Sequence, residues 1–159
     1  MSSCKAIISI VLMTVFINSM AANLPHGCEV TGFSYKDNYL IVNQTGNQSF
    51  YLIQNRSNTL VTLERFETQE VFMSPPLTAK LDPTSWAAFA SDVENLHFKC
   101  VIKEDDNDKQ IDCGEVLEVC QYPRVKFALS NMGNYWVSMN KAQDQVINES
   151  ASKGILLRW

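Results

Sequence analysis

Apolar and polar residues alternate along much of the chain with the two-residue period of half-buried β-strands. The clearest case is 96–102, where one face carries Leu96, Phe98, Cys100 and Ile102. This alternation is typical of a strand with one face in the core. Together with the turn-forming residues between the runs, it predicts strands at Glu29–Tyr35, Tyr39–Asn43, Phe50–Gln54, Leu60–Phe66, Trp86–Ser91, Leu96–Lys103, Gln110–Val119, Arg124–Leu129 and Tyr135–Met139.

Two segments depart from this alternation. Residues 73–85 contain Pro75-Pro76 and Asp82-Pro83, and proline cannot donate to a sheet ladder, so we expect a connection with at most an edge strand. The polar segment Lys141–Lys153 ends at Gly154, a possible C-cap, and predicts a helix. Its narrow apolar stripe consists of Ala142, Val146, Ile147 and Ala151. With Ile155–Trp159 as a terminal strand, the fold is expected to be mostly β: a single β-sandwich-like domain with one C-terminal helix.

The first 21 residues have the pattern of a cleavable signal peptide. Lys5 is the only charge before Glu29, Ala6–Ile17 is an apolar run, and Ser19 and Ala21 are the small residues of a cleavage site. The run is too short for a membrane span, which needs about 20 apolar residues. We therefore expect export to the periplasm or medium without a membrane anchor, with residues 22–159 as the mature domain and Ala22 as a second possible cleavage point.

The cysteines agree with export, because the expected mature domain keeps the even set Cys28, Cys100, Cys113 and Cys120. A hairpin turning at Asp106-Asn107 would place Cys100 opposite Cys113, at the Cβ separation that a disulfide needs. The sequence thus favours Cys100–Cys113 with Cys28–Cys120. The alternative pairing is Cys113–Cys120 with Cys28–Cys100, and a zinc site is disfavoured because no C-x₂-C pair occurs.

No pattern in the sequence assembles a catalytic site. His26 and His97 are the only histidines, no Gly-x-Ser-x-Gly turn or phosphate loop occurs, and no cofactor or metal is implied. The acidic tract 104–108 with Asp112 has Ile111 where a calcium loop requires glycine, so it is interpreted as a solvated hairpin tip. A tertiary carboxylate pair, as in glycoside hydrolysis, stays open at this point.

Charge argues against nucleic acid as a partner. The net charge is −4, and it becomes −5 without Lys5, with basic residues scattered along the chain. Four Asn-x-Ser/Thr triplets begin at Asn43, Asn47, Asn55 and Asn148, the first three in predicted turns where glycans would lie in a eukaryotic secreted protein.

Aromatic residues are the remaining candidates for a binding surface. Trp86, Phe89 and Phe98 are interpreted as core. Tyr135 and Trp136 are adjacent, and neighbouring strand residues point to opposite faces, so a strand buried on one side would expose one of them. Tyr135, Trp136 and the terminal Trp159 are therefore the candidate partner contacts.

Several blocks resemble one family. They are Gly27-Cys28, 81–90 with Phe98-Lys99-Cys100-Val101, 111–126 with its two cysteines, and Asn134-Tyr135-Trp136. This set resembles the enhanced-entry protein EnhB family, short exported proteins of intracellular Gram-negative bacteria, although Pro83-Thr84-Ser85 stands where the family has Pro-Gly before the tryptophan. The resemblance implies a periplasmic or secreted location and a part in bacterial entry into host cells, and it supplies no catalytic residues.

Two hypotheses follow from the sequence. The first is an exported, non-enzymatic binding protein with a protein partner in the bacterial envelope or at the host surface. The second is a small exported hydrolase acting on cell-wall or host material. The first is favoured because no nucleophile, base or metal set can be recognised in the sequence.

Overall fold

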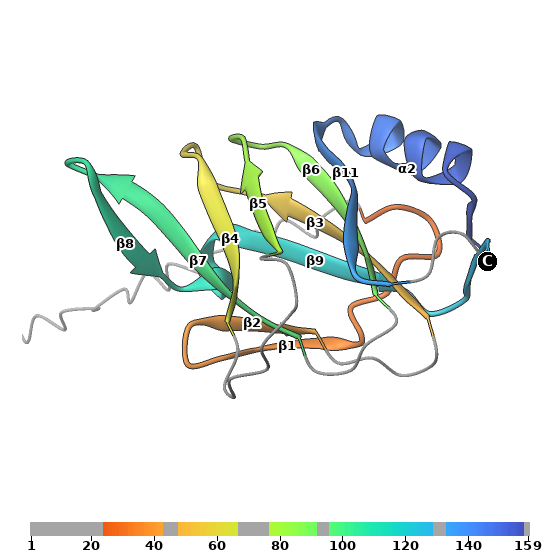
Figure 1. Ribbon diagram of the computed structural model, residues 1–159, viewed down its shortest axis with the longest axis horizontal. Coiled ribbons are helices and arrows are strands. Elements are labelled where there is room, and N and C mark those ends of the chain that lie inside the picture. Colours follow the sequence, from red (N-terminus) through yellow and green to blue (C-terminus); the bar gives the residue numbers. More distant parts are fainter. Residues whose placement is uncertain (1–23, 43–47, 67–76, 92–95, 129–132, 158–159) are drawn as a thin grey trace, which may run out of the picture.

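Two antiparallel sheets lie face to face in the computed structural model, which describes residues 24–42, 48–66, 77–91, 96–128 and 133–157 (Figure 1). The strands are β1 (Phe33–Lys36), β2 (Tyr39–Val42), β3 (Ser49–Asn55), β4 (Val61–Phe66), β5 (Thr78–Leu81), β6 (Trp86–Ser91), β7 (Leu96–Glu104), β8 (Asn107–Ile111), β9 (Leu117–Tyr122), β10 (Val125–Phe127), β11 (Tyr135–Lys141) and β12 (Ile155–Leu157). The helices are α1 (Cys113–Val116) and α2 (Gln143–Ser152). One sheet has the order β1-β2-β7-β4-β5 with β8 added to β7, the other has the order β11-β6-β3-β9, and β10 pairs with β12.

The four-stranded sheet is buried on both faces, which gives the molecule two cores. The inter-sheet core lies between the two sheets and includes Tyr51, Phe89 and Phe98. The outer core lies on the other face of the four-stranded sheet, where Val146 of α2 and Ile155 of β12 cover it. Strands β3 and β6 accordingly have near-continuous burial rather than alternation. The expected mostly β sandwich with a C-terminal helix is confirmed, and a helix layer on one sheet completes it.

Both predicted disulfides are present. Cys28 is bonded to Cys120 with a Cα–Cα distance of 5.6 Å, and Cys100 is bonded to Cys113 with a Cα–Cα distance of 5.3 Å. The first bond fixes the segment before β1 to β9, next to the outer core. The second fixes the start of α1 to the middle of β7, within the inter-sheet core.

The predicted register of the β7–β8 hairpin is wrong by two residues, because the turn lies one residue earlier in the chain than predicted. Cys100 lies opposite Ile111, and the turn consists of Asp105-Asp106 between Glu104 and Asn107. Both turn residues have positive φ, 50° and 63°, as a two-residue turn matched to the strand twist requires. Cys113 still reaches Cys100 because the chain bends into α1 directly after β8.

The predicted strand Gln110–Val119 is also wrong, because α1 interrupts it. The side chain of Asp112 accepts a hydrogen bond from the Gly114 N–H at 2.8 Å and caps this single turn. Strand β8 belongs to the six-stranded sheet and β9 to the four-stranded sheet, so the chain has to turn a corner between them. An uninterrupted strand could not join both layers.

Two other predicted elements need smaller corrections, and the edge strand allowed for the proline-containing segment is present. The strand expected from Glu29 starts only at Phe33, since Gly32 adopts a φ of 71°, and Glu29 forms a single bridge to Gln121. Residues 78–81 of the proline-containing segment form β5, an edge strand of its sheet. Helix α2 buries Val146 and Ser150 and leaves Ala151 of the predicted stripe exposed. Ser150 can be buried because its hydroxyl donates a hydrogen bond to the Val146 carbonyl at 2.7 Å.

Candidate functional site

Two of the three aromatic residues predicted as partner contacts lie half-buried on β11, and Trp159 lies outside the described residues. Tyr135 packs against the outer core and Trp136 against the inter-sheet core. The argument that one of them must face solvent assumed a strand buried on one side, and β11 belongs to a sheet with a core on each face. A role for Tyr135, Trp136 or Trp159 in partner binding stays a prediction.

Trp136 belongs to an aromatic cluster that joins the two sheets. Its ring centroid lies 4.9 Å from that of Phe89 on β6 and 6.0 Å from that of Phe98 on β7. The indole N–H of Trp136 is buried and has no hydrogen-bond partner among the described residues. Ring packing rather than polar contact therefore holds this tryptophan, and its substitution will affect folding as well as any binding.

A buried polar network ties the segment before β1 to the four-stranded sheet. The Gln121 side-chain amide donates to Ser49 at 3.0 Å and to Tyr51 at 3.3 Å, and the Tyr51 hydroxyl donates to the Gly32 carbonyl at 3.1 Å. Burial raises the pKa of Tyr51 to about 12, so this phenol stays protonated and remains a donor. A Cβ on Gly32 would lie 2.0 Å from the Gln121 side-chain oxygen. The network holds the segment before β1 against β3 and β9, and its polar groups form hydrogen bonds with one another.

Asn55 is a structural residue that the sequence reasoning placed in an exposed turn. It is fully buried at the end of β3, where its side-chain N–H₂ group donates to the carbonyls of Thr59, Leu81 and Asp82 at 2.7, 3.0 and 3.1 Å. Its side-chain oxygen accepts from Ser57. The folded protein therefore offers no room for a glycan at Asn55, whereas Asn148 is exposed on α2 and Asn43 and Asn47 lie outside the described residues.

The two histidines lie in different parts of the fold. His26 is exposed in the turn before the Glu29 bridge, and His97 is a half-buried residue of β7 in the six-stranded sheet, opposite Ile41. The acidic hairpin tip is held by cross-strand ion pairs, Lys103–Asp108 at 3.2 Å and Lys109–Glu104 at 2.6 Å. Within the described ranges no group of three or more His, Cys, Asp and Glu side chains could hold a metal ion.

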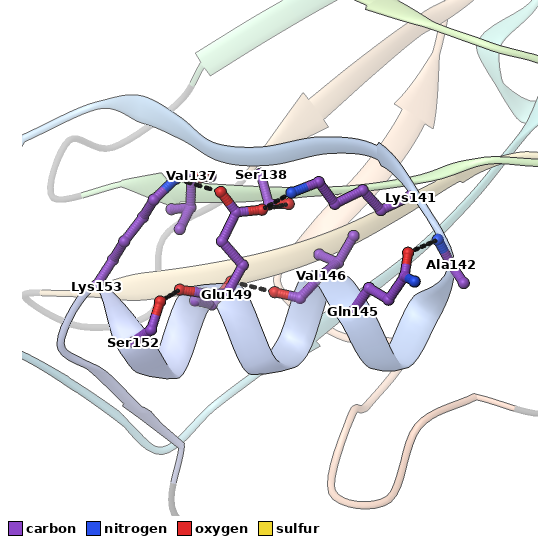
Figure 2. A network of polar contacts seen from close by, with 10 residues as sticks. Val137, Ser138, Lys141, Ala142, Gln145, Val146, Glu149, Ser152 and Lys153 are labelled. Atoms are coloured by element: carbon purple, nitrogen blue, oxygen red, sulfur yellow. Dashed lines mark hydrogen bonds and ion pairs between the residues drawn. The ribbon is translucent and has the colours of Figure 1, made fainter.

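The densest polar cluster joins α2 to β11 (Figure 2). Glu149 of α2 accepts from Lys141 at 2.6 Å, from Lys153 at 2.7 Å and from the hydroxyl of Ser138. Lys153 also donates to the Val137 carbonyl. The contacts from the two lysines and Ser138 lower the pKa of Glu149 to about 2. A carboxylate with so low a pKa is a poor general base, so this contact does not activate Ser138 as a nucleophile. The cluster fixes the helix on the sheet.

Replacing Glu149 with Gln should remove a pH-dependent part of the stability. The folded-state pKa of about 2 lies below the usual glutamate value, so the stabilisation is present above about pH 4.5 and disappears as pH falls towards 2. Because the Glu149 side chain is partly exposed and solvent screens its ion pairs, we expect a difference of only about 1 kcal/mol at neutral pH. Urea unfolding of both proteins between pH 2 and 7 measures it. A difference between the two proteins that does not shrink below pH 4.5 would contradict the assignment.

The outer half of the β7–β8 hairpin is exposed to solvent. It projects from the end of the sandwich, and every residue from Lys103 to Gln110 is exposed (Figure 1). The Cys100–Cys113 disulfide and the buried part of β7 hold its base. The hairpin is thus a supported arm whose outer half packs on neither core, and it is the candidate interaction surface of the described structure.

The disulfides indicate an oxidising environment outside the cytoplasm. Among the helices of the described ranges, none has the length and apolar character needed to cross a membrane. Comparisons with protein-family models, with curated proteins and with solved structures found no match to this chain.

Proposed function

We propose that this protein is an exported, non-enzymatic binding protein that contacts a protein partner through the β7–β8 hairpin. The observation that carries the proposal is the exposed outer half of this hairpin on a base fixed by Cys100–Cys113. Exposed segments on a rigid base often carry the binding residues of a protein, so the outer half of the hairpin is a suitable surface for contact with another molecule. The partner is proposed to lie in the bacterial envelope or at the host surface, with the protein itself periplasmic or secreted.

The resemblance to the EnhB family supports a part in bacterial entry into host cells. The contacts of the interior hydroxyl groups support a non-enzymatic role over the hydrolase alternative. Ser49 contacts an amide of Gln121, Ser91 contacts Asn134, and Ser138 contacts the weakly basic Glu149. Each of these serines thus has a partner unsuited to take its proton.

Site-specific photo-crosslinking in the cells that naturally make the protein tests the proposed surface. A photoreactive residue at Asp108 or Gln110 should give the same cross-linked product, and one at the exposed Asn148 of α2 should not. Asn148 is a matched control because it is also exposed, on an element away from the hairpin. Cross-linking from Asn148 without cross-linking from the hairpin would contradict the proposal.

A further inference from the structure

The outer edge of β8 presents main-chain groups that no other described strand uses. Within the described ranges, β8 pairs with β7 alone. Counting outward from the two-residue turn, Glu104 with Asn107 and Ile102 with Lys109 are the hydrogen-bonded pairs of the ladder. The N–H and C=O groups of Asp108 and Gln110 therefore point away from β7. The same sheet has two other edge strands, and each is tied to the four-stranded sheet. Tyr35 of β1 donates to the Leu117 carbonyl of β9 at 3.1 Å. Directly after β5, the Asp82 N–H donates to Asn140 of β11 at 2.8 Å.

The charged side chains of β8 can also form ion pairs with an additional strand beside it. Lys109 and Asp108 are adjacent on β8, and each already pairs with a residue of β7. Their side chains are more than half exposed, 53% for Lys109 and 65% for Asp108. Exposed ion pairs of this kind contribute little and rearrange readily. Charged side chains also oppose indiscriminate strand pairing, so a partner has to present matching charges.

A second copy of this chain does not present matching charges. Regular antiparallel pairing of two β8 edges must place outward-pointing residues opposite one another. The symmetric registers centred on Asp108 and on Lys109 oppose each of these residues to its own copy. The register centred on Gln110 leaves only residues 109–111 to pair, because β8 ends at Ile111. Like charges directly opposite destabilise a sheet. Self-association is therefore disfavoured by like charges in two registers and by the short ladder in the third, so another sequence is the favoured occupant.

We propose that the β8 edge receives an extended segment of another protein as an additional antiparallel strand, with an acidic residue opposite Lys109 and a basic residue opposite Asp108. Read from its N-terminus, such a segment carries the acidic residue immediately before the basic one. Main-chain hydrogen bonds to Asp108 and Gln110 supply the affinity, and the two charges set the register. This inference rests on the proposed function and names the chemistry of its partner.

The test uses a seven-residue peptide, Thr-Val-Thr-Glu-Lys-Thr-Val, titrated into the isotopically labelled mature protein and followed by NMR. We expect saturable shifts at the amides of Asp108 and Gln110 and slowed hydrogen exchange there. The control peptide has Glu and Lys exchanged, and we expect it to bind about tenfold more weakly, since an antiparallel register then opposes like charges. Absence of shifts at these amides at millimolar peptide, or equal binding of both peptides, would overturn the proposal.

Two variants separate the contribution of the Gln110 main-chain N–H to peptide binding from that of its side chain. Gln110→Ala keeps the outward N–H and should bind within about twofold of wild type, whereas Gln110→Pro removes it and should bind about tenfold more weakly. The reverse order of these affinities would overturn the proposal. If hairpin cross-links form but the peptide does not bind, strand addition is wrong and the proposed function stands. If the peptide binds but the hairpin gives no cross-link in cells, the proposed function fails instead.

Discussion

Replacing Phe89 with Ala should lower the free energy of unfolding by about 3–5 kcal/mol, the cost typical of deleting a buried aromatic ring. Phe89 is fully buried on β6, and its ring contacts Phe98 from the facing sheet and Trp136 from β11. The substitution would leave a cavity at the point where both sheets meet. Since small domains are stable by only about 5–15 kcal/mol, this single change removes a large share of the total.

Urea unfolding followed by tryptophan fluorescence measures this effect, because Trp136 lies against the altered site. Val30→Ala is a suitable control, as Val30 is 70% exposed and the change should stay within about 0.5 kcal/mol. A loss below about 1.5 kcal/mol for Phe89→Ala would show that the two sheets do not pack through this ring.

Removing Cys28–Cys120 should cost more stability than removing Cys100–Cys113. The first bond links residues 92 apart and the second links residues 13 apart. Chain entropy sets upper limits of about 4.7 and about 3 kcal/mol for loops of these sizes. The β7–β8 ladder already holds the ends of the shorter loop close together, so its realised contribution should be smaller still.

The comparison uses paired alanine variants, so that no free thiol is left. Cys28→Ala with Cys120→Ala should also release the segment around Leu24, which packs against the outer core. Denaturation midpoints and slopes of both double variants, under identical oxidising conditions, give the two free energies. A larger loss from Cys100→Ala with Cys113→Ala would mean that the hairpin is not independently formed.

Local pattern predicted most strands because it reports the environment of one face of one segment. The alternation of 96–102 gave β7 with Phe98 and Cys100 inside, and the turn-forming residues separated the other strands correctly. The cysteine pairing also followed from the sequence. A register error of two residues preserves which side chains share a face, so Cys100 and Cys113 remained within reach of each other.

The exact turn of the hairpin could not be read from the tract Glu104–Lys109. Several of its acidic and amide residues tolerate positive φ, so the sequence allows the turn at 105–106 or at 106–107. The start of α1 requires the chain to cross to the second sheet after Ile111, and this constraint comes from outside the segment. The register that turns the main-chain groups of Asp108 and Gln110 away from β7 was therefore decided by the tertiary structure.

The sequence by itself determined the class of the fold, the disulfides and the positions of most strands, since each rests on local periodicity or on residue type. Only the tertiary structure decided which strands are buried on both faces. Tyr135 and Trp136 are both half-buried because α2 and the β10–β12 pair, distant in sequence from β3 and β6, build a second core on the outer face of their sheet. Asn55 is likewise buried by residues distant in sequence, since its partners Leu81 and Asp82 come from β5 and the connection after it. Burial by a remote element leaves no trace in the alternation of the segment that it covers.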